Sequence, residues 1–286
     1  MTELQLDVAV VNFNSGAWLS RCLSSLLHQK VLLRITVVDN ASSDTSLSDA
    51  AAFTSQVTVI RNNRNIGFGA AVNQALADSK APYVLVINPD CEVQAGALSH
   101  LIKALDDDLS VGIAGPLVIN ADGSEQRANR RRTPTARRSL VTALGLEALG
   151  LEGVNVRGQL PSEPTRLSAV SGAALMIRRD CWLGLAGYDT GYFLHCEDLD
   201  LFRRAQQQDW KIMLVPAARV VHGKGVSHSG HQLVAERHKL AGMLRYYAKF
   251  EAAKTPWWMR SLWPLAVRLR YCLRWPVLAL RQRASR

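Results

Sequence analysis

The chain has 286 residues, of which 48% are hydrophobic, and it carries a formal net charge of +10. This length allows one large core, or one core with an appendage. The five cysteines are scattered without a CxxC pair or a zinc-type spacing, which argues against a metal or disulfide framework and favours a reducing compartment. Because the first residues are polar and no long apolar run follows, we expect neither a signal peptide nor a transmembrane helix.

Positive charge is concentrated in two stretches. Six arginines lie between residues 127 and 138, and eight basic residues with no acidic one lie between residues 254 and 286. Such charge is typical of proteins that bind nucleic acid, anionic membranes or phosphorylated ligands, and composition does not choose among these partners.

The first part of the chain alternates predicted strands and helices. We expect strands at residues 7–11, 35–38, 57–60, 83–87 and 111–119, with helices near 18–27, 66–79 and 95–105. This alternation predicts a doubly wound α/β domain. The turn after the first strand lacks the glycine fingerprint of dinucleotide-binding proteins, which argues against an NAD enzyme.

Polar residues follow these strands where they end. Asp39 closes the second strand, where a carboxylate can accept hydrogen bonds from a nucleobase or ribose. The turn at residues 65–69 opens a helix and can hold an anion. The buried run YVLVI is stopped by Asn88 and Pro89, so Asp90 should lie at the carboxyl end of a central strand. There Asp90 either binds Mg²⁺ or Mn²⁺ or caps the next helix.

The chain changes character after residue 120. We expect a loop-rich insertion over residues 120–165, with one short helix near 139–149. Its arginine cluster is either a solvated face or a contact with acceptor phosphates or a membrane surface, and both interpretations stay open.

A second group of candidate residues follows the insertion. A strand is expected at residues 169–177, in which Ser171 and Gly172 are small enough to allow the close approach of a ligand. Glu197, Asp198 and Asp200 fall within four residues, ahead of a helix expected at 199–208. Carboxylates at a helix start are favourable through the helix dipole alone. Crowded beside an apolar run, however, one of them could have a raised pKa and serve as a general base. Short strands are expected at 210–215 and 219–222, so His222 stands at a strand end.

Seven stretches of the chain, taken in order, resemble those of a GT-A glycosyltransferase of family 2, close to its bacterial rhamnosyltransferase-like members. They are VAVVNFNSG, VVDNASSD, NRNIGFGAAVNQAL, VLVINPD, SGAALMIRR, GYDTGYFLHCEDLDL and VVHGKGVS. The resemblance covers residues 7–225. It implies an α/β GT-A fold, the nucleotide-diphospho-sugar transferase fold with a doubly wound mixed sheet, and transfer with inversion at the anomeric carbon.

The resemblance also implies a role for each candidate residue. The nucleotide would contact Val11, Asn12, Asn14, Asp39, Asn65, Gly67 and Asn88. Asp90 and His222 would bind Mg²⁺ or Mn²⁺, Asp198 would be the catalytic base with Glu197 beside it, and the acceptor would meet Ser171, Gly172 and Asp200. Asn88 replaces the first aspartate of the family's DxD motif, which removes one charge from the metal site. This variant makes dTDP-rhamnose our first expectation for the donor.

The last part of the chain differs from the catalytic part. We place the catalytic domain at residues 1–228 and a C-terminal helical segment at 229–286. Tryptophans alternate there with arginines, and the apolar runs are too short to span a bilayer, which favours an anionic membrane surface as partner. The alternative is a helix that packs on the catalytic domain or on a second subunit. We therefore expect a cytoplasmic protein, peripheral on the inner face of the cell membrane, with a saccharide or lipid-linked saccharide as acceptor.

Three other functions were weighed. A sugar-nucleotide pyrophosphorylase would need a basic glycine-rich loop after the first strand, whereas residues 12–16 contain no basic residue. A nucleic-acid-binding protein would not explain carboxylates at strand and helix ends, since they repel phosphate unless a metal lies between. We therefore expect no nucleic-acid partner. A nucleotide-sugar-binding protein without transferase activity remains the alternative, and the oligomeric state stays open.

Overall fold

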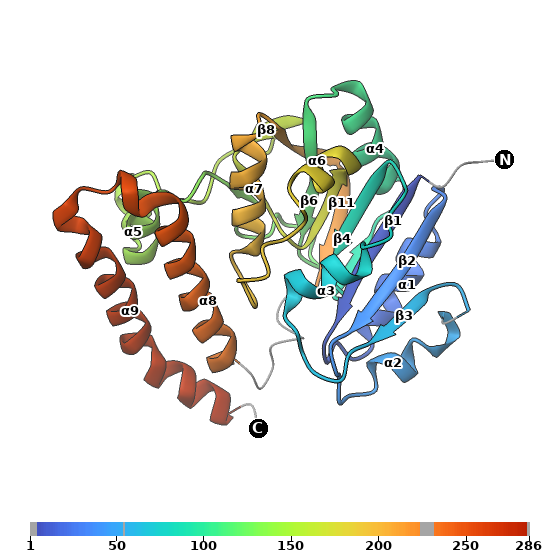
Figure 1. The fold of residues 1–286 in the computed structure, drawn as a ribbon, viewed down its shortest axis with the longest axis horizontal. Helices are drawn as coiled ribbons and strands as arrows, with labels where there is room; N and C mark the ends of the chain where they lie inside the picture. The colour runs from blue at the N-terminus through green and yellow to red at the C-terminus, as the bar shows by residue number, and fades with distance from the viewer. Residues whose placement is uncertain (1–4, 54, 224–231, 285–286) are drawn as a thin grey trace.

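The computed structural model describes residues 5–53, 55–223 and 232–284. Within them, one mixed sheet of nine strands is flanked by helices on both faces (Figure 1). Its order is β3-β2-β1-β4-β10-β6-β11-β5, and β8 pairs with β11. The strands are β1 (Leu6–Asn12), β2 (Leu33–Asp39), β3 (Thr58–Arg61), β4 (Tyr83–Ile87), β5 (Cys91–Val93), β6 (Val111–Ile119), β8 (Thr165–Leu167), β10 (Ala174–Arg178) and β11 (Lys211–His222).

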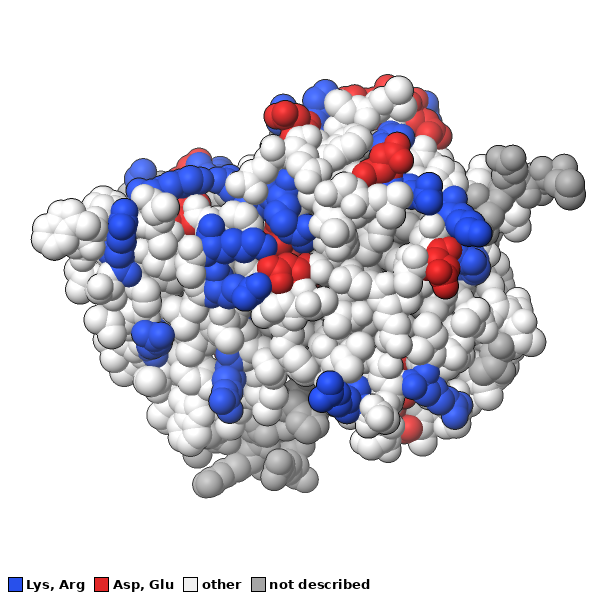
Figure 2. Space-filling view, viewed as in Figure 1, with Lys and Arg blue, Asp and Glu red and all other residues white. Residues whose placement is uncertain are grey.

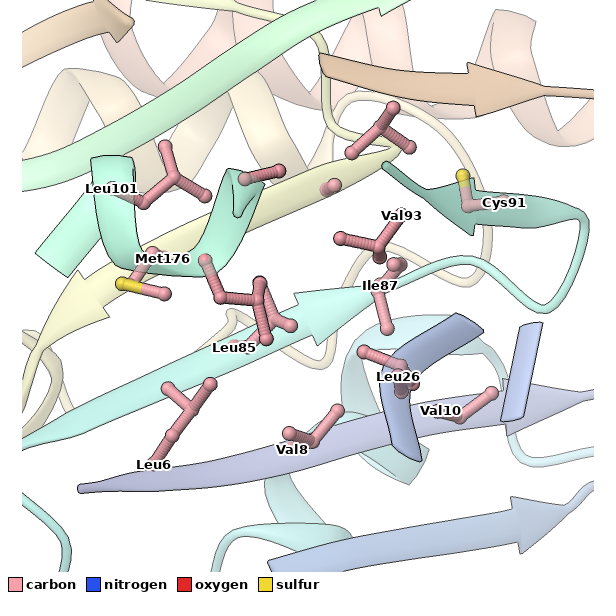
Figure 3. Close-up of a cluster of buried hydrophobic side chains, with 14 of the residues drawn as sticks. Leu6, Val8, Val10, Leu26, Leu85, Ile87, Cys91, Val93, Leu101 and Met176 are labelled. Carbon is pink, nitrogen blue, oxygen red and sulfur yellow. The ribbon is translucent and has the colours of Figure 1, made fainter. Parts of the chain in front are cut away.

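Two layers of helices cover the sheet. One apolar cluster lies under α1 (Trp18–Leu27) and α4 (Ala97–Asp107), whose apolar stripes face β1, β4 and β10. Figure 3 shows Leu26 and Leu101 from these helices above strand residues such as Val10 and Leu85. A second cluster lies under α3 (Phe68–Ala75), α6 (Arg179–Gly184) and α7 (Glu197–Gln207) on the opposite face. The predicted α/β fold is confirmed.

The sheet departs from the predicted pattern at β10, which is inserted antiparallel between β4 and β6. The single strand expected at 169–177 is therefore divided. Ala169–Val170 forms β9, which pairs with β7 (Arg130–Arg131) in a separate small sheet, and residues 171–173 link it to β10. Conversely, the two strands expected after residue 209 form one strand, β11, whose register shifts between Val215 and Arg219.

The C-terminal helices pack together beside the catalytic part of the molecule (Figure 1). They are α8 (Gln232–Tyr246), a π turn over Tyr247–Glu251 and α9 (Trp257–Ala284), with α5 (Ala136–Leu144) of the insertion against them. Trp263 of α9 stacks on Tyr247 with ring centroids 4.1 Å apart, and its indole N–H donates to the Ala136 carbonyl at 3.1 Å. The predicted boundary between residues 228 and 229 lies outside the described residues.

One face of α9 remains uncovered. Its exposed apolar side chains are Trp257, Trp258, Leu262, Leu265, Leu269, Leu273 and Trp275. Around α8 and α9 in Figure 2, isolated Lys and Arg side chains lie within a largely uncharged surface. Among the described residues, no helix combines the length and the apolar character that crossing a membrane requires.

Candidate active site

Parallel pairing brings the first two strand ends together. β1 and β2 run in register, so Asn12 lies directly opposite Asp39 at the carboxyl edge of the sheet. The Asn12 side-chain amide donates to Asp39 Oδ1 at 2.7 Å, and the Ser42 hydroxyl donates to the same oxygen at 2.6 Å. Within the described part of the chain, Asp39 Oδ2 accepts only a longer bond of 3.3 Å, from the Ser42 N–H. This oxygen therefore keeps hydrogen-bonding capacity for a ligand.

The other residues predicted to contact the nucleotide surround this pair. Val11 is buried in β1, and the left-handed Asn14 (φ 51°) accepts a 2.8 Å hydrogen bond from the Ser43 N–H. Asn65 caps its own turn by accepting from the Gly67 N–H at 2.9 Å. A Cβ on Gly67 would lie 2.8 Å from the carbonyl oxygen of Phe193, so glycine is required where this turn meets the loop before α7. Their contact with a nucleotide stays a prediction.

A carboxylate and an imidazole meet at the neighbouring strand end. The short strand β5 begins directly after Asp90 and pairs antiparallel with β11, which sets Cys91 opposite His222. His222 Nε2 consequently lies 3.1 Å from Asp90 Oδ1, and the Gly223 N–H donates to the Asp90 carbonyl at 2.8 Å. The structure thus brings together the two predicted metal ligands, which are 132 residues apart in the sequence.

Gln126 completes this centre, and sequence reasoning missed it. Its Oε1 accepts from His222 Nδ1 at 2.7 Å, while its Nε2 donates to the His222 carbonyl and to Asn120 Oδ1, both at 3.2 Å. These two donations fix the amide orientation, so Nδ1 is the protonated ring nitrogen and Nε2 is the one that faces Asp90. No motif around Gln126 could have indicated this, since the contact depends on how the insertion folds back.

The side chains around Asp90 fit a divalent cation that takes its remaining ligands from a bound molecule. Asp90, Cys91 and His222 offer ligand atoms that lie within 4.8 Å of one another. Burial, followed by the charge of Asp90, raises the pKa of the Cys91 thiol well above its usual range. Cys91 therefore stays a thiol and donates weakly to the Ala173 carbonyl at 3.5 Å. A carboxylate and an imidazole remain, which suit Mg²⁺ or Mn²⁺ when a diphosphate supplies further oxygens.

Asp198 forms the second centre, at the start of α7. Its Oδ2 accepts from Arg131 Nη2 at 2.5 Å, and the same guanidinium donates from Nε to the Val170 carbonyl at 3.1 Å. A Cβ on Gly172 would lie 2.7 Å from Asp198 Oδ2, so a larger residue would displace the carboxylate. Gly172, predicted to meet the acceptor, therefore lies against the predicted base.

Glu197 lies beside Asp198 but is almost fully buried. Its Oε2 has no hydrogen-bond partner among the described residues. Burial, followed by the charge of Asp198, raises the pKa of Glu197 to about 8. Near neutral pH Glu197 therefore favours its protonated form, while Asp198 Oδ2 lies against the Arg131 guanidinium. The sequence predicted one raised pKa among these carboxylates, and the structure identifies Glu197 as the group.

Asp200 does not have the surroundings predicted for an acceptor contact. Its side chain is fully buried, and both of its oxygens are occupied, by Arg204 Nε at 2.5 Å and by Lys249 Nζ at 2.6 Å. A carboxylate held by two cations inside the protein cannot reach an acceptor. Asp200 instead ties α7 to the π turn after α8, and its predicted contact with the acceptor finds no support in this geometry.

The two centres are neighbours because the same short segments touch both. Residue Ala173 accepts a 2.8 Å bond from the Asn88 N–H, next to Asp90, whereas Gly172 contacts Asp198. Within the insertion, Gln126 holds the first centre and Arg131 holds the second. Three features thus lie near the carboxyl edge of the sheet. They are the polar residues around Asp39, the candidate metal centre at Asp90 and His222, and the carboxylate of Asp198.

A mixed α/β sheet with these two carboxylate centres at one edge is the arrangement that the sequence led us to expect of a nucleotide-sugar transferase. The chain belongs to glycosyl transferase family 2, whose match covers residues 7–180. The predicted resemblance is confirmed, and the protein is a glycosyltransferase.

Two curated relatives extend this similarity. The chain is 29% identical over 280 residues to the N-acetylglucosaminyl-diphospho-decaprenol L-rhamnosyltransferase of Mycobacterium tuberculosis, covering 93% of this chain and 90% of that protein. It is 23% identical over 188 residues to the rhamnosyltransferase WbbL of Escherichia coli, covering 66% of this chain and 69% of that protein.

Two solved structures share the fold. The mannosyltransferase PcManGT from Pyrobaculum calidifontis, in complex with GDP-Man and Mn²⁺, aligns with a TM-score of 0.58 at 15% identity, over 100% of this chain and 74% of that chain. GalNAc-T7 with UDP, GalNAc and Mn²⁺ aligns with a TM-score of 0.59 at 20% identity, over 77% of this chain and 44% of that chain. At these identities the likeness describes the fold alone.

Proposed function

We propose that this glycosyltransferase moves L-rhamnose from dTDP-rhamnose to a lipid-linked saccharide during the synthesis of a bacterial surface polysaccharide. The observation that carries the proposal is the alignment with the mycobacterial L-rhamnosyltransferase, because it spans 93% of this chain and reaches beyond the family match into the C-terminal helices. The name of that relative also supplies the acceptor class, a saccharide joined to a polyprenol through a diphosphate.

The donor would bind along the ends of β1, β2 and β4. Asp39 Oδ2 and the turns at Asn12–Asn14 and Asn65–Gly67 would contact the base and ribose, with Asn88 nearby. A divalent cation held by Asp90 and His222 would neutralise the negative charge that develops on the departing nucleoside diphosphate. Gln126 supports this assignment, because it keeps His222 Nε2 directed at Asp90.

Asp198 would act as the general base. It takes the proton from the acceptor hydroxyl while that oxygen attacks C1 of the donor sugar from the face opposite the nucleotide. The bond from C1 to the phosphate oxygen breaks as the new glycosidic bond forms, and the anomeric centre inverts. Glu197, protonated near neutral pH, would be available as a hydrogen-bond donor beside this carboxylate, and Ser171 and Gly172 would border the acceptor.

The exposed face of α9 supports the predicted contact with an anionic membrane surface. Apolar side chains at 262, 265, 269 and 273 recur at helical spacing, and arginines at 260, 268, 270 and 274 lie on the same helix. We expect the paired variant Leu265→Gln/Leu269→Gln to float with anionic vesicles about tenfold less than the native chain. The control is Leu109→Gln, which changes an exposed leucine in the loop after α4, and equal flotation of all three proteins would contradict the proposal.

A transfer assay with a panel of donors tests the reaction itself. The full chain is mixed with Mn²⁺, a synthetic N-acetylglucosaminyl-diphospho-prenol and dTDP-rhamnose, UDP-sugars or GDP-sugars in turn. We expect product only with dTDP-rhamnose, and a thermal shift with dTDP that requires Mn²⁺. A nucleotide-dependent shift without product from any donor would favour the alternative, a nucleotide-sugar-binding protein without transferase activity.

A further inference from the structure

A cavity of about 370 Å³ opens behind Asp198, between the insertion, β8 and α7. Three arginines line it, Arg131 and Arg132 from the insertion and Arg166 from β8, together with Gln206 near the end of α7. No carboxylate is among its lining residues. A concave surface of this kind, bearing several guanidinium groups, is suited to a phosphorylated ligand.

The positive charge of the cavity is only partly neutralised. Arg131 is paired with Asp198, and Arg132 shares Glu152 with Arg138, at 3.0 Å and 2.7 Å respectively. Arg166 is exposed, and in the described ranges it has no ion-pair partner. Each phosphate of a diphosphate diester carries one negative charge, so such a group would complement the guanidinium groups that remain.

Arg131 connects this cavity with Asp198, the proposed general base. One side of its guanidinium contacts Asp198 and the Val170 carbonyl, while its side chain also forms part of the cavity wall. Gln206 lies eight residues after Asp198 on α7, which corresponds to about 12 Å along the helix axis. A ligand in the cavity would thus begin within the length of one arginine side chain from the base and extend away from it along α7.

The segment that carries Arg131 and Arg132 also contacts the C-terminal helices. The chain passes from Arg132 to Ala136 in four residues, and the Ala136 carbonyl accepts the hydrogen bond of Trp263 on α9. The Ala136 N–H in turn donates to Glu251 at 3.2 Å, at the end of the π turn. The arginines are therefore carried on a segment that is fixed at its other end to the helix with the exposed apolar face.

We propose that the cavity lined by Arg131, Arg132 and Arg166 binds the diphosphate of the acceptor, so that the acceptor sugar lies at Asp198 and the lipid leaves toward α9. The identity of the acceptor rests on the proposed function, whereas the anion site rests on the arginines. Arg166 is the specificity-determining residue to change, because it is exposed and touches neither the base nor the metal centre.

The first test measures binding of inorganic pyrophosphate to the full chain by calorimetry. A metal chelator is present throughout, so that pyrophosphate cannot bind through a metal ion. We expect Arg166→Ala to weaken binding about tenfold. Lys30→Ala is the control, because it also removes one exposed positive charge, but from the loop after α1, the helix on the opposite face of the sheet from α7. Absent pyrophosphate binding, or binding that Arg166→Ala leaves unchanged, would overturn the proposal whether or not the chain transfers sugar.

The second test uses transfer to two acceptors with the same sugar, a short prenyl diphosphate and a neutral alkyl glycoside, in the absence of vesicles. Arg166→Ala should raise KM about tenfold for the diphosphate acceptor and leave KM for the neutral acceptor and for the donor unchanged. An equal change for both acceptors would contradict a diphosphate site. If neither acceptor receives sugar but pyrophosphate binding still depends on Arg166, the proposed reaction is refuted. The proposed anion site is then retained.

Discussion

The donor and acceptor sides of the site are built from different interactions. Around Asn12 and Asp39, neutral amides and hydroxyls hold one carboxylate, and the residues involved come from adjacent strand ends. Around Asp198, charged side chains hold one another, and the partners come from distant segments, as with Arg131 and Asp198, which are 67 residues apart. The donor side thus follows from the order of the strands, whereas the acceptor side depends on the insertion and α8.

Backbone strain is found on the acceptor side as well. His195 and Cys196 both have φ of 69° directly before α7, a conformation that costs non-glycine residues roughly 1–2 kcal/mol each. Close packing maintains it, because a Cβ on Gly242 of α8 would lie 2.6 Å from the His195 carbonyl oxygen. The C-terminal helices therefore support the loop that leads into α7 and its two carboxylates, and changes to the two sides should have separable effects.

The largest effect is expected from Asp198→Asn. Loss of the general base should lower the transfer rate by about 10²–10⁴-fold, which corresponds to roughly 3–5 kcal/mol, because an amide cannot take the acceptor proton. Binding of dTDP with Mn²⁺ should remain within about twofold of the native value. Transfer at a near-native rate would show that another group is the base, and lost nucleotide binding would show that the two sides are not separable.

The next effect concerns stability and pH. Because burial raises the pKa of Glu197 from 4.5 to about 8, the folded state keeps a proton that the unfolded state releases. Stability from this group is therefore greatest below pH 4.5 and falls as the pH rises from about 4.5 to about 8, by roughly 5 kcal/mol in total. Glu197→Gln cannot ionise, so its free energy of unfolding, measured by urea titration between pH 5 and pH 8, should fall less steeply than that of the native chain. Parallel pH profiles would mean that Glu197 is already ionised in the folded state.

A smaller effect is expected at the first centre. Gln126→Leu removes the acceptor that orients His222, and it should weaken Mn²⁺ binding in the presence of dTDP by about 10–100-fold, or roughly 1.4–2.7 kcal/mol. The matched control is Asn120→Ala, which removes only the outer partner of Gln126 and should change the affinity for Mn²⁺ much less. The Mn²⁺ affinities of the two variants are measured by titration with Mn²⁺, using electron paramagnetic resonance to detect the free ion. Unchanged affinity in Gln126→Leu would argue against His222 as a metal ligand.

The smallest effect is expected on the donor side. Asp39→Asn keeps the shape of the side chain but removes the charge that accepts hydrogen bonds from the nucleotide. The dissociation constant of dTDP should rise about tenfold, or roughly 1.4 kcal/mol, while KM for the acceptor stays unchanged. Calorimetry and initial-rate kinetics give the two values. A change in acceptor KM of the same size would show that the neutral network also shapes the acceptor side.

The sequence by itself determined the fold class, the family and the candidate residues of the site. The hydrophobic pattern predicted the buried strands, and strand-terminating residues such as Asn88 and Pro89 predicted where they end. Both predictions were possible because a strand and the residues at its end are local features of the sequence. Asp39, Asp90 and Asp198 could therefore be identified as candidates before any contact was known. The predicted strand at 169–177 was only partly right, since the sequence does not reveal which of two sheets each half joins.

Only the tertiary structure decided which of these residues meet. Pairing of β5 with β11 brings Asp90 to His222, and the folding back of the insertion brings Gln126 to His222 and Arg131 to Asp198. The same packing buries Asp200 between two cations, a burial that no local sequence pattern indicated. These contacts join segments tens of residues apart, and their free energies depend on burial and charge pairing that arise only once the chain has folded.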